Sequence, residues 1–383
     1  MAKEEMKIFY IVPLESIHAE RWMRYFADAG HDIHLITSDK PSQIIKNVKV
    51  NPLKRFGPHF PIISHLVNSI AKEFQFRKLI RTLKPDIIHA HYIMRATLLG
   101  AVSGFHPFVV TVWGSDILIA PKESKISRYI VRYVLRKADL ITCDAEHIKK
   151  PLVELGANPQ KIKIIYFGTN TRKFSPGKRD NKLREKLGIL DSPAIISLRN
   201  LQPLYDIKSL IIAIPQVLKK IPTAKFIIAG KGSEETKLKA LAKSLKILES
   251  IRFVGWIPNN ELPQYIASAD IYVSTSLSDA GLAASTAEAM ASELPVIITD
   301  FGDNRKWVKD GINGFIIPLR DPEVLAQKII YLLQNESERK KLGKANRQII
   351  EEKNNWEKEM GKMEKLYQEL IKKHKSGNTK CNN

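Results

Sequence analysis

The sequence predicts an α/β protein of two domains, each built on a parallel sheet with helices on both faces. Short strands rich in valine and isoleucine alternate with amphipathic helices over most of the 383 residues, a pattern typical of parallel sheets. Residues 167–178 are rich in Gly, Thr, Asn, Ser and Pro, and they interrupt the alternation as a linker would. At roughly 150 residues per domain, the length fits two domains or three.

The first half is expected to hold six strands and four helices. The strands are predicted at residues 7–12, 32–37, 87–91, 108–112, 140–143 and 163–165. The helices are predicted at residues 18–29, 72–84, 93–103 and 127–136. This order of elements predicts a sheet whose strands are joined by helical crossovers.

The second half repeats the alternation and ends in a long helix. Its strands are predicted at residues 194–198, 225–229, 251–254, 271–275, 295–299 and 314–318. Helices between them are predicted at residues 207–219, 234–245, 262–268 and 285–292. The charged pattern of residues 356–374 predicts a terminal helix, and residues 376–383 are expected to be disordered.

The chain is strongly basic, with 61 Lys and Arg residues against 40 Asp and Glu residues and a net charge of +21. Nucleic acid, an anionic membrane or a phosphorylated substrate would each explain this excess. Four basic residues are spaced for one helix face: Lys125, Arg128, Arg132 and Arg136. This face is interpreted either as solvated surface or as a membrane-surface patch. No nucleic-acid-binding motif is present, so no nucleic-acid partner is expected.

Cysteine content and hydropathy indicate a cytoplasmic protein without a spanning helix. The two cysteines, Cys143 and Cys381, exclude a disulfide framework and a four-cysteine zinc site. The uncharged run at residues 96–115 is interrupted by Gly100, Gly104 and Pro107, which disfavours a membrane span. The first apolar run is too short for a signal peptide.

The first strand-to-helix turn excludes a large class of enzymes. Residues 13–18 contain no glycine, whereas a dinucleotide-binding domain places G-x-G-x-x-G there. A nicotinamide or flavin cofactor is therefore not expected. His89 and His91 lack a third ligand at a fitting spacing, so no metal is expected either. We expect His91 at the strand end and His89 packed on the opposite side.

The segment at residues 274–300, STSLSDAGLAASTAEAMASELPVIITD, contains the clearest candidate site. A strand ends near Thr275, a turn rich in Ser, Asp and Gly follows, and a helix begins near Ser285. The free N–H groups at such a helix start suit phosphate oxygens. Glu288 in the first turns could accept two hydrogen bonds from a ribose diol. The alternative is a capping network with a surface glutamate.

The string AEAMASELPVIITD at residues 287–300 resembles the glutamate-containing donor-binding motif of glycosyltransferase family 4. These are retaining sugar transferases of the GT-B fold. Further segments follow in the family's order, at residues 31–37, 85–92, 111–116, 197–214, 226–238, 253–276 and 310–318. The resemblance covers about the whole chain and is stronger in the second half.

The resemblance implies two Rossmann-like domains that face each other across a central cleft. Residues 1–172 would form the acceptor-binding domain, and residues 173–355 the domain that binds the nucleotide sugar. Residues 356–375 would form a helix that packs back on the first domain, followed by the tail at residues 376–383.

The resemblance also implies roles for residues of the donor domain. Glu288 would hold the donor ribose and Arg199 the donor diphosphate. The following family lysine is represented by Tyr205 or Lys208. The family's second acidic residue is replaced by Ala280, next to Asp279. Donor contacts are further expected from Asp279 and from three residues at the helix start, Gly281, Leu282 and Ser285.

In the acceptor domain, Trp113 stands where the family often has a histidine. His91 or Asp116 is expected to compensate as a catalytic group.

These observations predict a metal-independent glycosyltransferase of polysaccharide or glycolipid biosynthesis. Its co-substrate would be a UDP- or GDP-sugar, its acceptor lipid-linked or a saccharide, and its stereochemical outcome retention. An anionic membrane is a further expected partner, at the inner face of the cell membrane. Two alternatives remain open: a nucleotide-sugar epimerase of the same fold, and a nucleotide-sugar-binding protein made inactive by Ala280 and Trp113.

Overall fold

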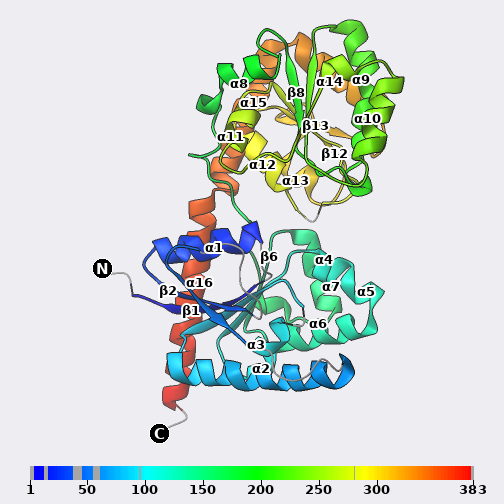
Figure 1. The fold of residues 1–383 in the computed structure, drawn as a ribbon. Helices are drawn as coiled ribbons and strands as arrows, with labels where there is room; N and C mark the ends of the chain where they lie inside the picture. The colour runs from blue at the N-terminus through cyan, green and yellow to red at the C-terminus, as the bar shows by residue number, and fades with distance from the viewer. Residues whose placement is uncertain are drawn as a thin grey trace. The chain divides into compact units, whose positions relative to one another are not determined.

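The computed structural model describes residues 4–12, 16–37, 45–54, 61–94, 96–279 and 281–380. The chain divides into two compact units (Figure 1): Met1–Tyr166 together with Glu359–Asn383, and Phe167–Lys358. Each unit contains one parallel sheet, which confirms the predicted α/β class. No helix among the described residues is long and apolar enough to cross a membrane.

The sheet of the first unit has the strand order β3-β2-β1-β4-β5-β6-β7 over the described residues, and all its pairs are parallel. The strands are β1 (Lys7–Ile11), β2 (Asp32–Thr37), β3 (Val48–Pro52), β4 (Ile87–His91), β5 (Phe108–Thr111), β6 (Leu140–Cys143) and β7 (Ile162–Ile164). The sequence predicts six of these and misses β3. This edge strand buries only Val48, so its sequence lacks an apolar pattern.

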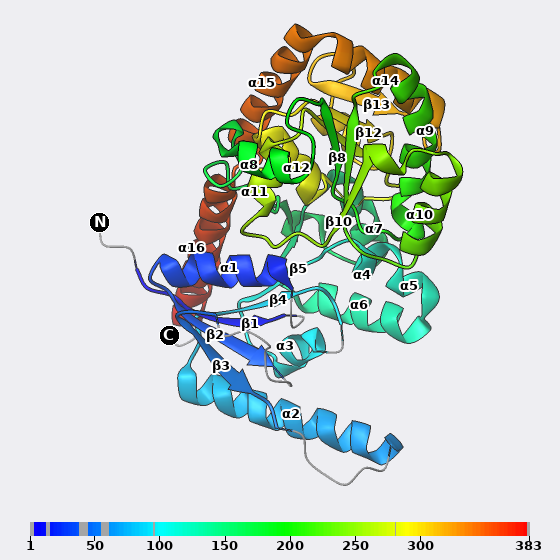
Figure 2. The ribbon, with the colours of Figure 1, turned by 45° about the horizontal axis from the view of Figure 1, so that its top comes forward.

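Helices cover both faces of this sheet, with α1 on one face and α2 and α3 on the other (Figure 2). The helices are α1 (Ile17–Asp28), α2 (Pro61–Leu83), α3 (Thr97–Ser103), α4 (Ser115–Leu118), α5 (Ala120–Glu123), α6 (Lys125–Lys137) and α7 (Lys149–Glu154). Helix α2 begins eleven residues before the predicted start, because its first turns contain neither a charge nor a helix stop signal.

The last helix, α16 (Trp356–Lys380), contributes to the core of the first unit. Tyr367 of α16 is fully buried, and its hydroxyl group lies 3.1 Å from that of Tyr10 in β1. Glu364 lies 3.0 Å from Nε2 of His31. The sequence predicts a helix end at Lys375 and a disordered tail, but α16 continues to Lys380 because no proline interrupts it. Residues 381–383 of that tail lie outside the described residues.

The sheet of the second unit has the order β10-β9-β8-β11-β12-β13. Its strands are β8 (Ala194–Ser197), β9 (Lys225–Ala229), β10 (Ile251–Gly255), β11 (Ile271–Ser274), β12 (Val296–Thr299) and β13 (Gly314–Ile317), all six of them predicted. Its helices are α8 (Asn181–Lys186), α9 (Ile207–Lys220), α10 (Glu235–Ser244), α11 (Leu262–Ala267), α12 (Ala284–Ala291), α13 (Asn304–Trp307), α14 (Pro322–Gln334) and α15 (Glu336–Lys353).

Candidate active site

The loops that carry the predicted donor residues leave the second sheet where its winding direction changes. β8 lies between β9 and β11, so crossovers run in opposite directions from this point. In open α/β sheets, ligands bind at the C-terminal edge of such a point. Thr275 Oγ1 donates a hydrogen bond to the carbonyl group of Tyr205 at 2.9 Å. Leu277 N donates to the carbonyl group of Leu204 at 2.8 Å, so the loops after β8 and β11 are tied together.

Arg199 is fixed between these two loops. Its guanidinium group forms an ion pair with Asp279, and its Cζ atom lies 4.4 Å from the centre of the Tyr205 ring. The side chain is 11% exposed, and its buried Nε atom has no hydrogen-bond partner among the described residues. A preoriented guanidinium group with an unused N–H suits a phosphate oxygen.

Burial and the ion pair both act on the charges of Arg199 and Asp279. Burial lowers the pKa of Arg199, but the Asp279 carboxylate reverses this effect and the net shift is upward. Burial raises the pKa of Asp279, and the guanidinium group opposes that shift without cancelling it. Arg199 therefore keeps its positive charge at physiological pH.

Two glycines after β9 allow the loop that carries Arg199 to pack closely against the loop after β9. Gly230 has φ +113°, and a Cβ atom there would lie 2.7 Å from the carbonyl oxygen of Arg199. A Cβ atom on Gly232 would lie 2.1 Å from the carbonyl oxygen of Leu201. Leu201 N also donates to the carbonyl group of Lys231 at 3.0 Å. This close backbone approach is possible only without side chains at the two glycines.

The start of α12 offers backbone N–H groups. Its N-cap residue, Ala283, makes no side-chain capping bond. The first N–H groups of a helix suit an anion. Gly281 is buried and Leu282 half-buried just before this start. Ala280, where the sequence departs from the family, lies outside the described residues.

Ser285 and Glu288 belong to the same helix, three residues apart. The Ser285 hydroxyl group lies 2.8 Å from the hydroxyl group of Tyr272, which is completely buried. Ser285 is thus engaged in holding α12 against β11. Glu288 is half-buried and one turn further from the helix start.

Of the two candidates for the family lysine, Tyr205 lies against Arg199. Lys208 is exposed in the first turn of α9. Asp206, between them, has φ +44° and accepts a hydrogen bond from Ser209 Oγ at 2.6 Å. The structure therefore brings together Arg199, Tyr205 and Asp279, and it places Lys208 on the adjoining helix surface.

In the first unit, His91 ends β4 and is almost fully buried. Its ring centre lies 4.3 Å from that of His89 and 4.9 Å from that of Trp22. The prediction that His89 faces the other side is wrong, because side chains two residues apart on a strand share a face. His89 Nε2 lies 2.7 Å from Thr111 Oγ1. Burial, and then the proximity of His91, hold the pKa of His89 well below its usual range.

Asp116 organises the loop after β5. Its carboxylate accepts hydrogen bonds from the backbone N–H groups of Ile93 at 2.9 Å, and of Trp113 and Gly114 at 3.0 Å each. It is fully buried, and burial raises its pKa to about 6 despite these bonds. Trp113 is half-buried, with its ring centre 5.7 Å from that of Tyr92. Asp116 thus fixes the backbone that presents Trp113.

Two family models match the chain, and between them they include every predicted site residue. The model described as glycosyl transferases group 1 matches residues 179–349, and glycosyl transferase 4-like matches residues 7–145. The chain belongs to the family 4-like glycosyltransferases. It is therefore an enzyme that transfers a sugar from a nucleotide sugar, as predicted.

Curated relatives of this glycosyltransferase include the putative glycosyltransferase EpsD of Bacillus subtilis, 28% identical over 85% of this chain and 86% of that protein. N-acetyl-alpha-D-glucosaminyl L-malate synthase of Bacillus anthracis is 25% identical over 92% and 93%. Alpha-monoglucosyldiacylglycerol synthase of Streptococcus pneumoniae is 29% identical over 57% of this chain and 47% of that protein. The epimerase alternative has no support among these relatives.

Solved structures confirm the GT-B fold of the glycosyltransferase. Anabaena Alr3699/HepE in complex with UDP has a TM-score of 0.80 at 18% identity, over 95% of this chain and 100% of that chain. Sucrose-phosphate synthase from Thermosynechococcus elongatus has a TM-score of 0.78 at 18% identity, over 95% and 99%.

Several residues that support the site of this glycosyltransferase are not among those that the sequence predicts. The G-x-G pattern at Gly230 and Gly232 was a usable signal, because it follows a strand. Tyr272 and Tyr92 had none. Tyr272 reads as an ordinary strand residue, and the positive φ of Tyr92, +62°, has no sequence signature in a tyrosine.

Proposed function

We propose that the second unit binds a nucleoside-diphosphate sugar with its diphosphate on Arg199 and its ribose on Glu288. The observation that carries this proposal is the buried, charged Arg199, whose Nε–H group has no partner within the part of the chain that the structure describes. The N–H groups at the start of α12, near Gly281 and Leu282, provide further phosphate contacts. The Glu288 carboxylate has the two acceptor oxygens that a ribose diol needs.

In the proposed transfer, the bond between the anomeric carbon and the diphosphate oxygen breaks as a bond to the acceptor hydroxyl forms. Arg199 stabilises the negative charge that grows on the leaving oxygen, and Lys208 adds positive charge nearby. We infer retention, with the acceptor attacking from the leaving-group face. The departing phosphate oxygen then takes the acceptor's proton. This step assigns no role to a metal or a separate cofactor.

We infer UDP as the nucleotide. The support is the fold likeness to Alr3699/HepE, which was solved with UDP and with UDP-glucose. Asp279 is predicted to contact the donor sugar, and we infer that its ion pair with Arg199 also positions the guanidinium group.

We infer that the first unit binds the acceptor at the C-terminal edge of its sheet. His91 and Trp113 are the side chains proposed to face the acceptor, whereas Asp116 acts as a positioning residue through the backbone of its loop. A lipid-linked acceptor is the proposed class. The support is the Streptococcus relative, which is named as the synthase of a diacylglycerol glycolipid.

We also propose peripheral binding to an anionic membrane at its cytoplasmic face. Helix α6 buries Val131, Val134 and Leu135 against the unit. It carries exposed Lys125, Arg128 and Arg136 and half-buried Arg132 on other faces. Basic helices of this kind are attracted to anionic headgroups.

The donor site is tested by thermal unfolding with UDP, GDP and ADP at equal concentration. UDP at a hundred times its Kd stabilises a protein by about 2.7 kcal/mol, and we expect this gain for wild type. Glu288→Gln should lose most of it. Glu338→Gln, at a half-buried glutamate of α15 in the same unit, is the matched control and should keep it.

Stabilisation by GDP alone would show that the nucleotide is GDP rather than UDP, and it would leave the proposed site unchanged. Equal stabilisation of wild type and Glu288→Gln would contradict the assignment of Glu288. A turnover assay distinguishes the enzyme from an inactive binding protein. An inactive binding protein would bind the UDP-sugar but would release no UDP with any acceptor mixture.

A further inference from the structure

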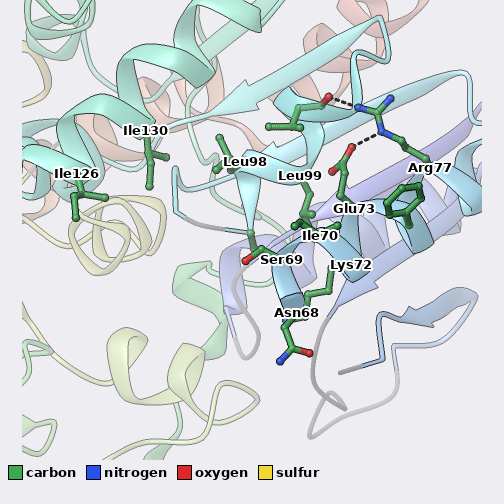
Figure 3. Close-up of a pocket in the computed structure, with 13 residues that line it drawn as sticks. Asn68, Ser69, Ile70, Lys72, Glu73, Arg77, Leu98, Leu99, Ile126 and Ile130 are labelled. Atoms are coloured by element: carbon green, nitrogen blue, oxygen red, sulfur yellow. Dashed lines mark hydrogen bonds and ion pairs between the residues drawn. The ribbon is translucent and has the colours of Figure 1, made fainter. Parts of the chain in front are cut away.

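The first unit contains a groove of about 630 Å³ between α2, α3 and α6 (Figure 3). Its size is that of a small-molecule site. Ile70 and Phe74 of α2 line one side, and Ile126 and Ile130 of α6 line the other. Leu98 and Leu99 of α3 lie between them. The lining is predominantly apolar, unlike the charged site of the second unit.

Several of these apolar side chains are strongly exposed. Phe74 is 71% exposed, Ile126 65% and Ile70 52%. Val67, Ile70 and Phe74 are spaced by three and four residues, so they form one stripe along α2. Such a contiguous exposed stripe marks a binding surface rather than scattered apolar residues.

The charges around the groove favour an anionic ligand. Among the described lining residues the one carboxylate is Glu73, which forms an ion pair with Arg77 at 2.7 Å. Arg77 also donates to the carbonyl group of Val102 at 2.6 Å, which joins α2 to α3. The Glu73 charge is thus compensated within the groove. Lys72 of α2 also lines the groove, so the cations among its described lining residues outnumber the carboxylates.

One end of the groove adjoins the proposed acceptor edge. α2, α3 and α6 each cross back between parallel strands, so their first turns lie at the C-terminal edge of the sheet. Leu98 and Leu99 belong to the first turn of α3. Thr97 Oγ1, in the same turn, donates to the carbonyl group of Tyr92 at 2.8 Å. Tyr92 contacts Trp113, so the groove and the acceptor loop share this edge.

We propose that this groove holds the apolar chain of an anionic lipid drawn from a bilayer. The chain lies against Ile70, Leu99 and Ile126, and the lipid phosphate meets Lys72 of α2. The inference rests on the lipid-linked acceptor proposed above, and it names the place where the lipid part binds. The membrane contact proposed above for α6 is electrostatic, and the groove would add an apolar contact to it.

The test is co-sedimentation of the full chain with vesicles of phosphatidylglycerol and phosphatidylcholine. At about 0.5 M NaCl the charge contribution is largely screened, and we expect wild type to stay bound through its apolar contact. Ile70→Glu/Ile126→Glu should weaken this salt-resistant binding by about tenfold or more. Val153→Glu, at an apolar residue of α7 that is 42% exposed, is the matched control and should bind as wild type.

Complete release of wild type at this salt concentration would overturn the proposal and leave a purely electrostatic contact. Unchanged binding of the double variant would also overturn it. A wild-type dimer that the double variant splits, without vesicle binding, would assign the groove to a second copy instead. UDP-induced stabilisation is measured on the same samples, and since UDP binds the second unit, its loss would indicate failure of the donor site rather than of the groove.

Discussion

The two units place different chemistry at the same edge of the same kind of sheet. The second unit presents a buried cation, Arg199, locked by a carboxylate and a tyrosine ring. The first unit presents His91, buried among aromatic rings, and an aromatic loop held by Asp116. This difference matches the two ligands. A diphosphate needs fixed positive charge, whereas the non-ionic part of an acceptor needs shape and apolar contact.

The largest expected effect is on turnover, when the cation of the second unit is removed. Arg199→Ala removes the cation that stabilises the leaving group, and we expect turnover to fall by about 10²–10³-fold. Steady-state release of UDP measures this. Arg305→Ala, at an exposed arginine paired with Asp300, is the control and should leave the rate unchanged. Arg199→Ala/Asp279→Asn separates lost catalysis from the cost of an unpaired buried carboxylate. A rate near wild type in both Arg199 variants would contradict the role of Arg199.

The next effect concerns pH and the first unit. The pKa of Asp116 is about 6 in the folded chain and 3.8 without burial, so the folded state binds its proton more tightly. Stability from this group is therefore greatest below pH 3.8 and falls as the pH rises to about 6, by at most about 3 kcal/mol. Denaturant unfolding of wild type against Asp116→Asn, which cannot titrate, should show this difference. A difference that is constant from pH 4 to pH 7 would contradict it.

A smaller effect tests how the Arg199 loop is positioned. Gly230→Ala introduces a Cβ atom 2.7 Å from a backbone oxygen at φ +113°, and we expect a loss of about 1–3 kcal/mol in unfolding free energy together with weaker UDP binding. Gly311→Ala is the control. Gly311 also has a positive φ, +71°, but open space around it, so it isolates backbone strain from the clash. Equal UDP affinity in both variants would show that the loop tolerates displacement.

The smallest expected effect lies in the core of the first unit. Tyr367→Phe removes the hydroxyl group that contacts His89 and Tyr10, and it should cost about 1 kcal/mol of unfolding free energy. UDP affinity should be unchanged, because the second unit holds the nucleotide. Calorimetric titration measures the UDP affinity of both proteins. A marked fall in the Tyr367→Phe variant would contradict the proposal that the second unit holds the nucleotide.

Much of the fold could be predicted because buried parallel strands are continuous apolar runs. All six predicted strands of the second unit are present. The roles of Arg199 and Glu288 come from the resemblance to family 4 and stay predictions. β3 was missed because an edge strand buries so little, and His89 was placed wrongly by neglecting the two-residue period of a strand.

The rest depends on contacts between distant segments. The pairing of Arg199 with Asp279 joins residues 80 apart, and the sequence offers no rule that selects Asp279 over its neighbours. The groove is assembled from three helices, and Ile126 looks like an ordinary inward-facing residue until α3 and α2 are placed beside it. Tertiary packing alone decides such features.

The placement of the nucleotide is tested most directly by amide hydrogen exchange with and without UDP. We expect slower exchange on UDP binding at residues 199–205 and 281–288, with residues 87–116 of the first unit unchanged. Protection confined to the first unit, or protection that spares both loops of the second, would contradict the placement of the nucleotide at the β8–β11 edge.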